Sequence, residues 1–438
     1  MYPSIFSARV TELILRLNSL GFSSKVLVAV AALFFQKVLR PSCQAPKLVG
    51  GLSPQMKAIL SRVPLLSSCP KLNIPSVVQL VIYAMQMMWQ EQQYESQYDF
   101  DVEVFLVALP GDSTEGFADH VHITWVKGMK GCKQQDLPAD APIVLLTPGL
   151  NCYSANLPGT AVYSKLLEQP WRIGVFEKRG VGGQGSHLKA PVFHMFGHPS
   201  DLHIVIKQLV ARWPDAPLHL LGMSSGNGLT SSYLALHGHE ISNLRSCLLL
   251  IGGEDYNSAF VPPKGNWLSR VVFDNALLAA SKERMLQRNE PILRAHNGNA
   301  YDAAMRAKTM QEFYDICMQH FSGYTDHEEA ERRINPFNGG TNECMLCFKK
   351  PCLVCFTEDD PVAPGGPRKS WMEVIDNCAY AAVALFPTGS HLACYDTWSL
   401  SRWVDGLAVE WVNAVHAAHP MPAHSPEEVG SAPQGTIS

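Results

Sequence analysis

The segment Pro217–Leu236, PLHLLGMSSGNGLTSSYLAL, carries the most informative pattern in the chain. Its first residues, Pro217–Leu221, are mainly apolar and predict a short buried strand, and Leu229–Leu236 can form a helix. Between them lies the pentapeptide GMSSG (222–226), in which small residues let a strand and a helix pack closely across a sharp turn. A serine held there, beside a helix N-terminus that favours negative charge, is suited to nucleophilic acyl transfer.

The rest of the chain alternates strand-like and helix-like segments, which predicts an α/β fold with a mostly parallel sheet flanked by helices. We expect eight strands, at Val104–Leu109, Val121–Lys127, Ile143–Thr147, Ile173–Glu177, Leu218–Gly222, Cys247–Ile251, Cys352–Phe356 and Ala381–Phe386. We expect the flanking helices at Gly159–Leu167, Pro199–Arg212, Asn227–His237, Pro367–Asp376 and Trp398–His416.

This alternation breaks between about residues 253 and 338, after the sixth strand. The helix-like segments there are Leu268–Lys282, Arg284–Leu293, Ala300–His320 and His327–Arg333. An insertion at this point would lie over the carboxyl edge of the sheet, where ligands bind in α/β folds. We therefore expect a helical cap over the site, the alternative being a helical decoration without a role in binding. Residues 419–438 are rich in Pro, Ser, Gly and Glu and predict a disordered tail.

Residues 1–94 form a basic, apolar N-terminal segment. The stretch from Leu13 to Gln90 has no Asp or Glu and carries +8, which leaves −12 for the remainder of a chain with net charge −4 (−4 minus +8). Such a segment suits docking at an anionic membrane surface, the alternative being a solvated face. Val26–Phe35 is too short to span a bilayer, and the longer Leu20–Leu39 includes two lysines. A membrane anchor, an organelle-targeting presequence and a helix packed on the body stay open.

The cysteines bear on compartment and on metal binding. Twelve are scattered along the chain and no N-x-S/T site occurs, which favours a reducing compartment. We expect membrane association with the catalytic domain on the cytoplasmic side, the alternatives being a soluble cytoplasmic or organellar protein. The pairs Cys344/Cys347 and Cys352/Cys355 resemble zinc ligands, but alternation puts Cys352 and Cys355 on opposite faces of a strand. We expect neither a metal nor an organic cofactor.

A serine nucleophile needs a general base, an acid that orients the base, and an oxyanion site. Beyond a nucleophile elbow, the acid and then the histidine follow in the chain. Asp359 and Asp360 come directly after a strand; Asp360 is our first choice for the acid and Asp359 the reserve. His391 follows the last strand and is the expected base, with Gly389 giving its loop the freedom to bend the imidazole toward Ser224.

The oxyanion site is expected to use two backbone N–H groups. One is that of Ser225, directly after the nucleophile. The second is expected in the loop after the third strand, where Gly149 permits close approach and Leu150 supplies the N–H. An ordinary turn is the alternative interpretation of Pro148-Gly149.

Six blocks of the sequence carry a family resemblance: TPGL (147–150), FEKRGVGG (176–183), GMSSGN (222–227), AKTMQEFYD (307–315), DDP (359–361) and GSHL (389–392). Over about residues 95–415 the chain resembles α/β-hydrolase-domain esterases and lipases. It is similar to the branch whose eukaryotic members are often membrane-anchored and act on esters or phospholipids.

The resemblance implies an α/β-hydrolase fold over residues 95–418. It also implies that Ser224, Asp360 and His391 form a catalytic triad and that the N–H groups of Leu150 and Ser225 bind the oxyanion. The sequence departs from the family in having Pro148-Gly149 where His-Gly is common, and Lys178 where Asp or Asn is common.

Together these observations predict a serine hydrolase that cleaves lipid-like carboxylic esters through an acyl-enzyme on Ser224. The alternatives are an acyltransferase that uses the same acyl-enzyme and a non-catalytic binding protein on a hydrolase scaffold. The expected partners are an ester substrate and a membrane surface, with no nucleic acid. Acyl chain, head group and oligomeric state stay open.

Overall fold

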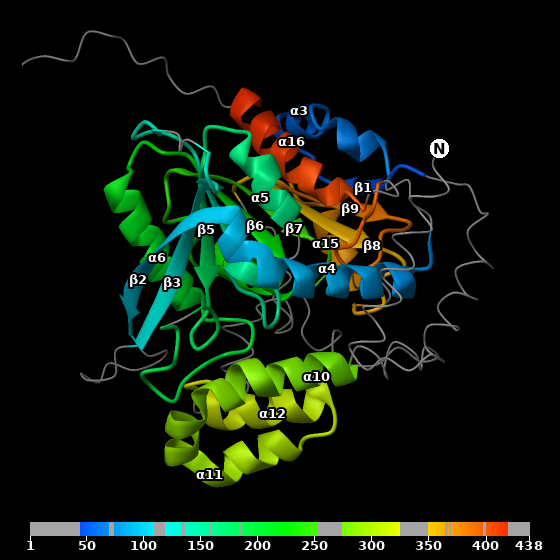
Figure 1. The fold of residues 1–438 in the computed structure, drawn as a ribbon. Helices are drawn as coiled ribbons and strands as arrows, with labels where there is room; N and C mark the ends of the chain where they lie inside the picture. The colour runs from blue at the N-terminus through cyan, green and yellow to red at the C-terminus, as the bar shows by residue number, and fades with distance from the viewer. Residues whose placement is uncertain are drawn as a thin grey trace, which may run out of the picture.

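The structure is a computed structural model that describes residues 44–69, 74–108, 119–132, 136–157, 160–183, 185–252, 274–324, 349–363, 367, 369–396 and 400–418. Figure 1 shows one large sheet with helices on both faces and a separate group of helices below it. Within the described ranges the sheet has nine strands in the order β1-β9-β8-β7-β6-β4-β5-β3-β2. The strands are β1 (Lys47–Gly50), β2 (Tyr98–Val107), β3 (Asp119–Met129), β4 (Ile143–Thr147), β5 (Arg172–Glu177), β6 (Leu218–Met223), β7 (Leu244–Leu250), β8 (Cys352–Thr357) and β9 (Ala381–Phe386).

The centre of the sheet is parallel and its edges are antiparallel. β4 pairs in parallel with β5 and β6, and parallel pairing continues through β7 and β8 to β9. The pairs β2–β3, β3–β5 and β1–β9 are antiparallel. The predicted α/β fold with a mostly parallel sheet is therefore confirmed, and all eight expected strands are present.

The ninth strand, β1, corrects the expectation of eight. It has only four residues, KLVG, and all of them are exposed or half-buried. The sequence therefore has no long apolar run that would predict this strand. It pairs with the outer edge of β9. At its end Gly50 has φ +82°, and a Cβ there would lie 2.5 Å from the Ile375 carbonyl oxygen. The strand is thus fixed by its edge pairing rather than by burial.

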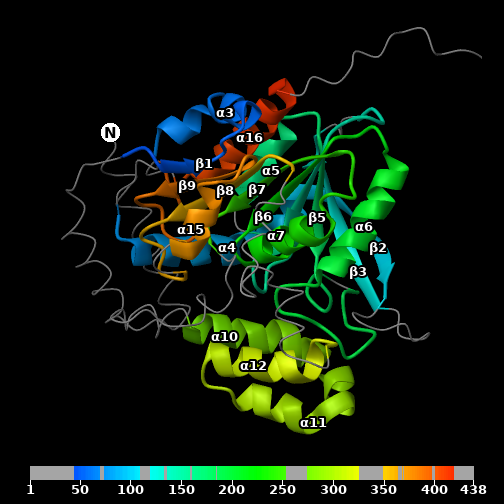
Figure 2. The same cartoon turned by 180° about the vertical axis from the view of Figure 1, so that it is seen from behind.

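Two apolar layers enclose the sheet, and Figures 1 and 2 show their helices from opposite sides. The helices of one layer are α3 (Pro54–Leu60), α4 (Ser76–Gln97), α5 (Thr160–Leu167) and α16 (Trp403–Ala418). Those of the other layer are α6 (Pro199–Arg212), α7 (Ser225–His237) and α15 (Lys369–Ile375). Cys355 and Cys352 of β8 pack in opposite layers, which confirms the alternation expected for this strand.

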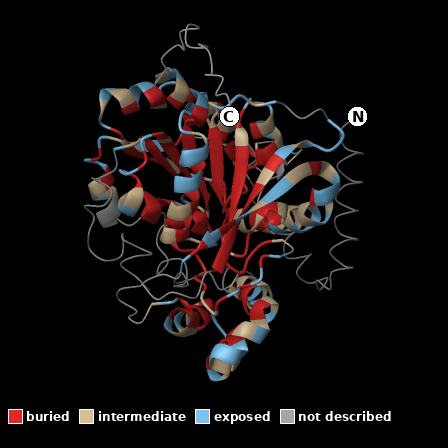
Figure 3. Ribbon diagram, turned by 90° about the vertical axis from the view of Figure 1, so that its left-hand side faces the viewer, coloured by how far each residue is buried: buried red, intermediate tan, exposed pale blue. Residues whose placement is uncertain are grey.

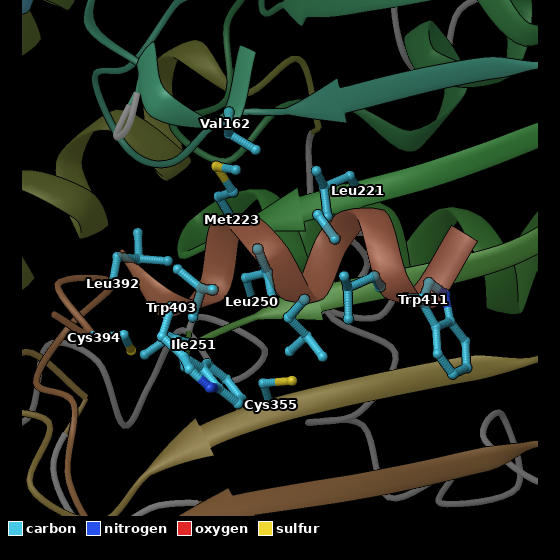
Figure 4. Packing of buried hydrophobic residues seen from close by; sticks show 14 of the residues in the cluster. Val162, Leu221, Met223, Leu250, Ile251, Cys355, Leu392, Cys394, Trp403 and Trp411 are labelled. Atoms are coloured by element: carbon cyan, nitrogen blue, oxygen red, sulfur yellow. The ribbon is translucent and has the colours of Figure 1, made fainter. Parts of the chain in front are cut away.

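Helix α16 anchors the loop that follows β9. Figure 4 shows side chains from this helix, from neighbouring strands and from the loop gathered in one cluster, including Trp403, Leu250 and Leu392. The Trp403 ring meets that of Phe386 edge to face, with centroids 4.6 Å apart. The backbone N–H of Trp403 also donates to the Cys394 carbonyl oxygen at 2.8 Å. The loop that carries the expected base is therefore tied to the core.

The described part of the basic N-terminal segment packs on the body of the protein. β1 joins the sheet, and Glu91 of α4 accepts a hydrogen bond from the Tyr153 hydroxyl at 2.7 Å. Glu91 also pairs with Arg284 at 2.7 Å. The apolar residues of α4 contribute to the core, so part of the stretch without acidic residues, which ends at Gln90, serves packing.

The membrane anchor and the state of the cysteines are the two remaining expectations about this segment. No helix among the described residues is long and apolar enough to cross a membrane, and the candidate span Leu20–Leu39 lies outside them. Cys69 is disulfide-bonded, whereas the other described cysteines are free. The reducing compartment expected from the sequence stays a prediction.

The helices below the sheet are the described part of the insertion expected at 253–338. They are α10 (Asn275–Ser281), η4 (Lys282–Leu286), η5 (Gln287–Asn289), α11 (Glu290–Arg306) and α12 (Met310–Phe321). They share an apolar cluster, and Figure 3 shows buried residues on parts of these helices. The single helix expected at Ala300–His320 is wrong, because Thr309 caps α12 by accepting a hydrogen bond from the Glu312 N–H at 3.1 Å. The tail at 419–438 lies outside the described residues.

The insertion contacts the loops that follow β4 and β5. The Asn151 amide donates to Ser281 Oγ at 2.9 Å, and Arg284 donates to the Asn151 carbonyl oxygen at 3.1 Å. The Leu188 N–H donates to Asn289 Oδ1 at 2.9 Å. Both loops leave the carboxyl ends of parallel strands, so these helices lie over the edge of the sheet where ligands bind in α/β folds.

Candidate active site

Ser224 stands in the turn between β6 and α7. Its backbone has φ +51° and ψ −125°, a conformation that residues other than glycine rarely adopt. The flanking residues have to be small: a Cβ at Gly226 would lie 1.9 Å from the Thr147 carbonyl oxygen, and one at Gly222 would lie 2.7 Å from Asn227 Oδ1. This strained strand-to-helix turn has the geometry expected of a nucleophile elbow.

The three side chains expected to form a triad lie in one hydrogen-bonded chain. Ser224 Oγ and His391 Nε2 are 2.8 Å apart, and His391 Nδ1 lies 2.7 Å from Asp360 Oδ2. His391 is 7% exposed and Asp360 is 4% exposed, so their contact is shielded from water. When Nδ1–H donates to the carboxylate, the lone pair on Nε2 faces the serine hydroxyl, which is the arrangement of a general base.

The two adjacent carboxylates have different partners. Asp360 faces His391 through Oδ2, while its Oδ1 accepts hydrogen bonds from the N–H groups of Val362 at 2.7 Å and Ala363 at 3.0 Å. Asp359 accepts from the Ser390 N–H at 2.8 Å and from the Thr388 hydroxyl at 3.0 Å. Burial raises the pKa of Asp359, although these hydrogen bonds oppose the rise. Asp359 therefore braces the loop that carries His391, and Asp360 touches the imidazole itself.

Backbone conformation brings His391 toward Ser224. Gly389 has φ +147°, and a Cβ there would lie 2.8 Å from Cys394 Sγ. The Thr357 hydroxyl holds the loop by donating to the Ser390 carbonyl oxygen at 2.7 Å. Gly252, which follows β7, also lies against these side chains and was not predicted from the sequence. A Cβ there would lie 3.4 Å from His391 Cε1 and 3.3 Å from Asp360 Oδ2. The consecutive glycines at 252 and 253, directly after a strand, were the available signal.

The loop after β4 lies against the serine. A Cβ at Gly149 would be 3.2 Å from Ser224 Cβ. Neither the Leu150 nor the Ser225 N–H donates a hydrogen bond within the part of the chain that the structure describes. Behind the loop the Lys178 ammonium donates to the Gly149 carbonyl oxygen at 2.8 Å. The two N–H groups expected to bind an oxyanion thus remain available, one in the loop after β4 and one at the first residue of α7.

A buried ion pair fixes the turn that follows β5. Arg179 Nε donates to Asp201 Oδ2 at 2.7 Å and its NH2 group to Asp201 Oδ1 at 2.6 Å. Both side chains are at most 2% exposed. A two-pronged contact of this kind fixes direction as well as distance, so α6 and the loop beside the candidate site are joined rigidly.

One cluster among the described residues could hold a metal ion. His203, His237 and Glu240 place ligand atoms within 4.8 Å of one another. The cluster lies at the far end of α7 from Ser224, which for a 13-residue helix is about 20 Å. Glu240 accepts from His237 Nδ1 at 2.9 Å and lies 3.5 Å from His203 Nε2, so hydrogen bonding and charge already account for the cluster.

Comparison with known proteins assigns the family. A protein-family model described as serine aminopeptidase, S33, matches residues 139–397. The chain belongs to this α/β-hydrolase family. The matched range contains Ser224, Asp360 and His391, together with the loop after β4. The family resemblance in the sequence is therefore confirmed.

The hydrolase has relatives of low identity. Embryogenesis-associated protein EMB8 of Picea glauca is 22% identical over 294 residues, covering 64% of this chain and 60% of the relative. Phospholipase ABHD3 of Bos taurus is 24% identical over 284 residues, covering 63% and 64%. Monoacylglycerol lipase of Saccharomyces cerevisiae is 22% identical over 270 residues, covering 60% and 57%. The match thus spans less than two thirds of each relative's length.

Among solved structures, the esterase of Pyrobaculum calidifontis aligns with this hydrolase at a TM-score of 0.44 and 11% identity. The alignment covers 78% of this chain and 92% of that one.

Proposed function

We propose that this hydrolase cleaves carboxylic esters, with lipid-like esters as its substrates, through an acyl-enzyme on Ser224. The observation that carries the proposal is the continuous hydrogen-bonded chain from Ser224 Oγ through His391 to Asp360, with contacts of 2.8 and 2.7 Å. A serine on a strained elbow beside a properly oriented imidazole is the arrangement that nucleophilic acyl transfer requires.

In the acylation step, Ser224 Oγ attacks the ester carbonyl carbon while its proton passes to His391 Nε2. The carbonyl π electrons move to oxygen and form a tetrahedral oxyanion. Asp360 holds the imidazolium through Nδ1–H without taking its proton. When the oxyanion collapses, the C–O bond to the alcohol breaks and His391 returns the proton to the departing alkoxide oxygen. The acyl group stays on Ser224.

Deacylation repeats these steps with water. His391 takes a proton from the water as its oxygen attacks the acyl carbon, and the second tetrahedral oxyanion collapses by breaking the bond to Ser224 Oγ. The proton on His391 then returns to Ser224. An alcohol in place of water would give acyl transfer, so product analysis in the presence of an added alcohol separates the two outcomes.

The proposal assigns oxyanion stabilisation to the N–H groups of Leu150 and Ser225. Leu150 lies in the loop after β4 and Ser225 is the first residue of α7, and neither N–H has an acceptor within the described residues. Such preorganised donors are worth the most where water is excluded, and removing one typically costs about 10²–10³ in kcat.

The lipid-like substrate is supported by the relatives and by the insertion. Two relatives are named as a phospholipase and a monoacylglycerol lipase. In this chain Leu150, beside the expected oxyanion site, packs against the apolar cluster of the helices at 274–324. We propose that these helices are a cap over an acyl-binding region. The family model is named for an aminopeptidase, and amide hydrolysis would use the same acyl-enzyme, so both substrate classes belong in the test.

The test is a comparison of initial rates on four substrates: a monoacylglycerol, a phospholipid, a p-nitrophenyl ester and an aminoacyl anilide. We expect ester turnover that Ser224→Ala abolishes. Ser231→Ala is the matched control, because its hydroxyl donates within the same helix to the Gly228 carbonyl oxygen at 3.1 Å. Equal ester turnover in Ser224→Ala and wild type, or turnover of the anilide alone, would overturn the proposal.

We further propose that the basic N-terminal segment docks the hydrolase at an anionic membrane surface. Three of its basic residues, Lys47, Lys57 and Arg62, are described and all are exposed. The full-length chain should sediment with vesicles containing phosphatidylserine at low salt and be released as the salt concentration rises. Equal binding to neutral phosphatidylcholine vesicles, or no binding to either, would contradict this electrostatic docking.

A further inference from the structure

Lys178 is a buried lysine directly after β5, and it is only 2% exposed. No salt bridge joins it to a carboxylate of the described residues. Its ammonium instead donates to three carbonyl oxygens, those of Gly149 at 2.8 Å, Pro148 at 3.4 Å and Met195 at 3.5 Å. Burying an ammonium without an opposite charge is costly, so a lysine kept at such a place calls for a reason beyond packing.

The direction of the hydrogen bond to Gly149 supplies that reason. In a trans peptide the C=O of one residue and the N–H of the next point to opposite sides. The Gly149 oxygen is held on Lys178, so the N–H of Leu150 is directed away from the lysine. Gly149 itself lies against Ser224, since a Cβ there would be 3.2 Å from the serine Cβ. The ammonium, together with the Cys152 backbone N–H that donates to the same oxygen at 3.2 Å, thus orients one peptide group beside the nucleophile.

The lysine side chain is itself held in place. Gly197 has φ +92°, and a Cβ there would lie 3.1 Å from both Cγ and Cδ of Lys178. The same loop contributes the Met195 carbonyl oxygen to the ammonium. Because the stem is confined by the loop at 195–197, the ammonium cannot easily leave the Gly149 carbonyl.

We propose that Lys178 is a positioning residue that aims the Leu150 N–H at the oxyanion formed on an ester bound to Ser224. This inference rests on the proposed serine-hydrolase function and adds to it a residue that does not touch the substrate. It also gives a role to Lys178, which stands where the family that the sequence resembles commonly has Asp or Asn.

The charge of Lys178 should make this positioning depend on pH. Burial lowers the pKa of Lys178 to about 8. Burial also raises the pKa of Cys152 to about 11 and lowers that of His194 well below its usual value, so these two facing groups stay neutral near pH 8. The charged residues on either side of Lys178 bind other partners: Glu177 accepts a hydrogen bond from the Ser154 hydroxyl, and Arg179 donates to Asp201. Above about pH 8 the amine is neutral and its hydrogen bonds to the carbonyls weaken.

The experiment measures kcat and KM for a p-nitrophenyl ester between pH 6 and 10 in the full-length chain. Lys178→Met keeps the stem but removes all donors, and Lys178→Gln keeps an uncharged N–H donor. Lys189→Met, which removes an exposed lysine from the same region, is the matched control. We expect kcat to fall about 100-fold in Lys178→Met and less in Lys178→Gln, with KM within about threefold of wild type. In wild type and in the control, kcat should fall as the pH rises above about 8. In both Lys178 variants this alkaline fall in kcat should be absent.

Two results would overturn the inference. One is a kcat for Lys178→Met within about threefold of wild type; the other is the same fall of kcat above about pH 8 in wild type and in both variants. Should Lys178→Met fail to fold, the wild-type profile still decides, because kcat that stays flat up to pH 10 contradicts a charged positioning group. Failure of the proposed function looks different. In that case wild type itself shows no ester turnover, or Ser224→Ala retains it.

Discussion

Replacing Asp360 by Asn should disable the imidazole while leaving the site's shape intact. Oδ1 of Asp360 already accepts two backbone N–H groups, at 2.7 and 3.0 Å, so the amide oxygen of Asn is expected to keep that position. Its NH2 group then faces His391 Nδ1, 2.7 Å away in the native pair. Two donors cannot face each other, so Nδ1 loses its proton and Nε2 carries it. His391 can then no longer accept the proton of Ser224.

The expected loss in kcat is about 10⁴-fold, the magnitude known for a triad carboxylate replaced by its amide, which corresponds to about 5.5 kcal/mol. The assay is initial-rate hydrolysis of a p-nitrophenyl ester, with thermal unfolding of each variant as the measure of folding. Asp359→Asn is the matched control. Its amide can accept from the Ser390 N–H and donate to the Thr388 hydroxyl, so its kcat should stay within about tenfold of wild type. A larger loss in Asp359→Asn than in Asp360→Asn would refute the assignment.

Three further predictions concern the surroundings of the site. Asp201→Asn should lower the free energy of unfolding by about 3–5 kcal/mol in a denaturant titration, because it leaves Arg179 buried without its charge partner; an unchanged midpoint would contradict this. Gly226→Ala should reduce kcat at least about 100-fold, since its Cβ would lie 1.9 Å from the Thr147 carbonyl oxygen and displace the loop beside the nucleophile; unchanged ester turnover would exclude so close an approach of the loop to Gly226. Lys178 has a pKa lowered by burial from 10.5 to about 8, so between these pH values the unfolded chain binds more protons and stability rises with pH, by about 3 kcal/mol. Denaturant titrations at pH 7.5 and 10.5 should show this rise in wild type relative to Lys178→Met, and an equal change in both would refute it.

The fold was predictable where apolar runs are long and strands are buried. The central strands from β4 to β9 are mainly apolar segments in the sequence, and Ser224 stands where a strand passes into a helix. β1 escaped prediction because its KLVG residues are half-buried or exposed and are fixed by pairing with β9 alone. The break at Thr309 carried a signal, Thr followed three residues later by Glu, that the apolar periodicity of the helices obscured.

The candidate site was predictable in its residue types but not in its supports. Chain order alone pointed to Asp360 and His391, yet which of two adjacent aspartates faces the imidazole depends on how the loop after β8 turns. That turn is fixed by contacts from Asp359 to residues about 30 positions away, which no local pattern encodes. Lys178 was visible only as a departure from the family pattern, because its hydrogen bond to Gly149 joins two separate loops.

The proposed function depends above all on Ser224 acting as the nucleophile. The most direct measurement is reaction of the full-length chain with a fluorophosphonate, followed by mass spectrometry of the intact protein and of its peptides. We expect one adduct per chain, on the peptide that contains Ser224, with no adduct in Ser224→Ala and slow labelling in Asp360→Asn. An unlabelled wild type, or an adduct that persists in Ser224→Ala, would contradict it.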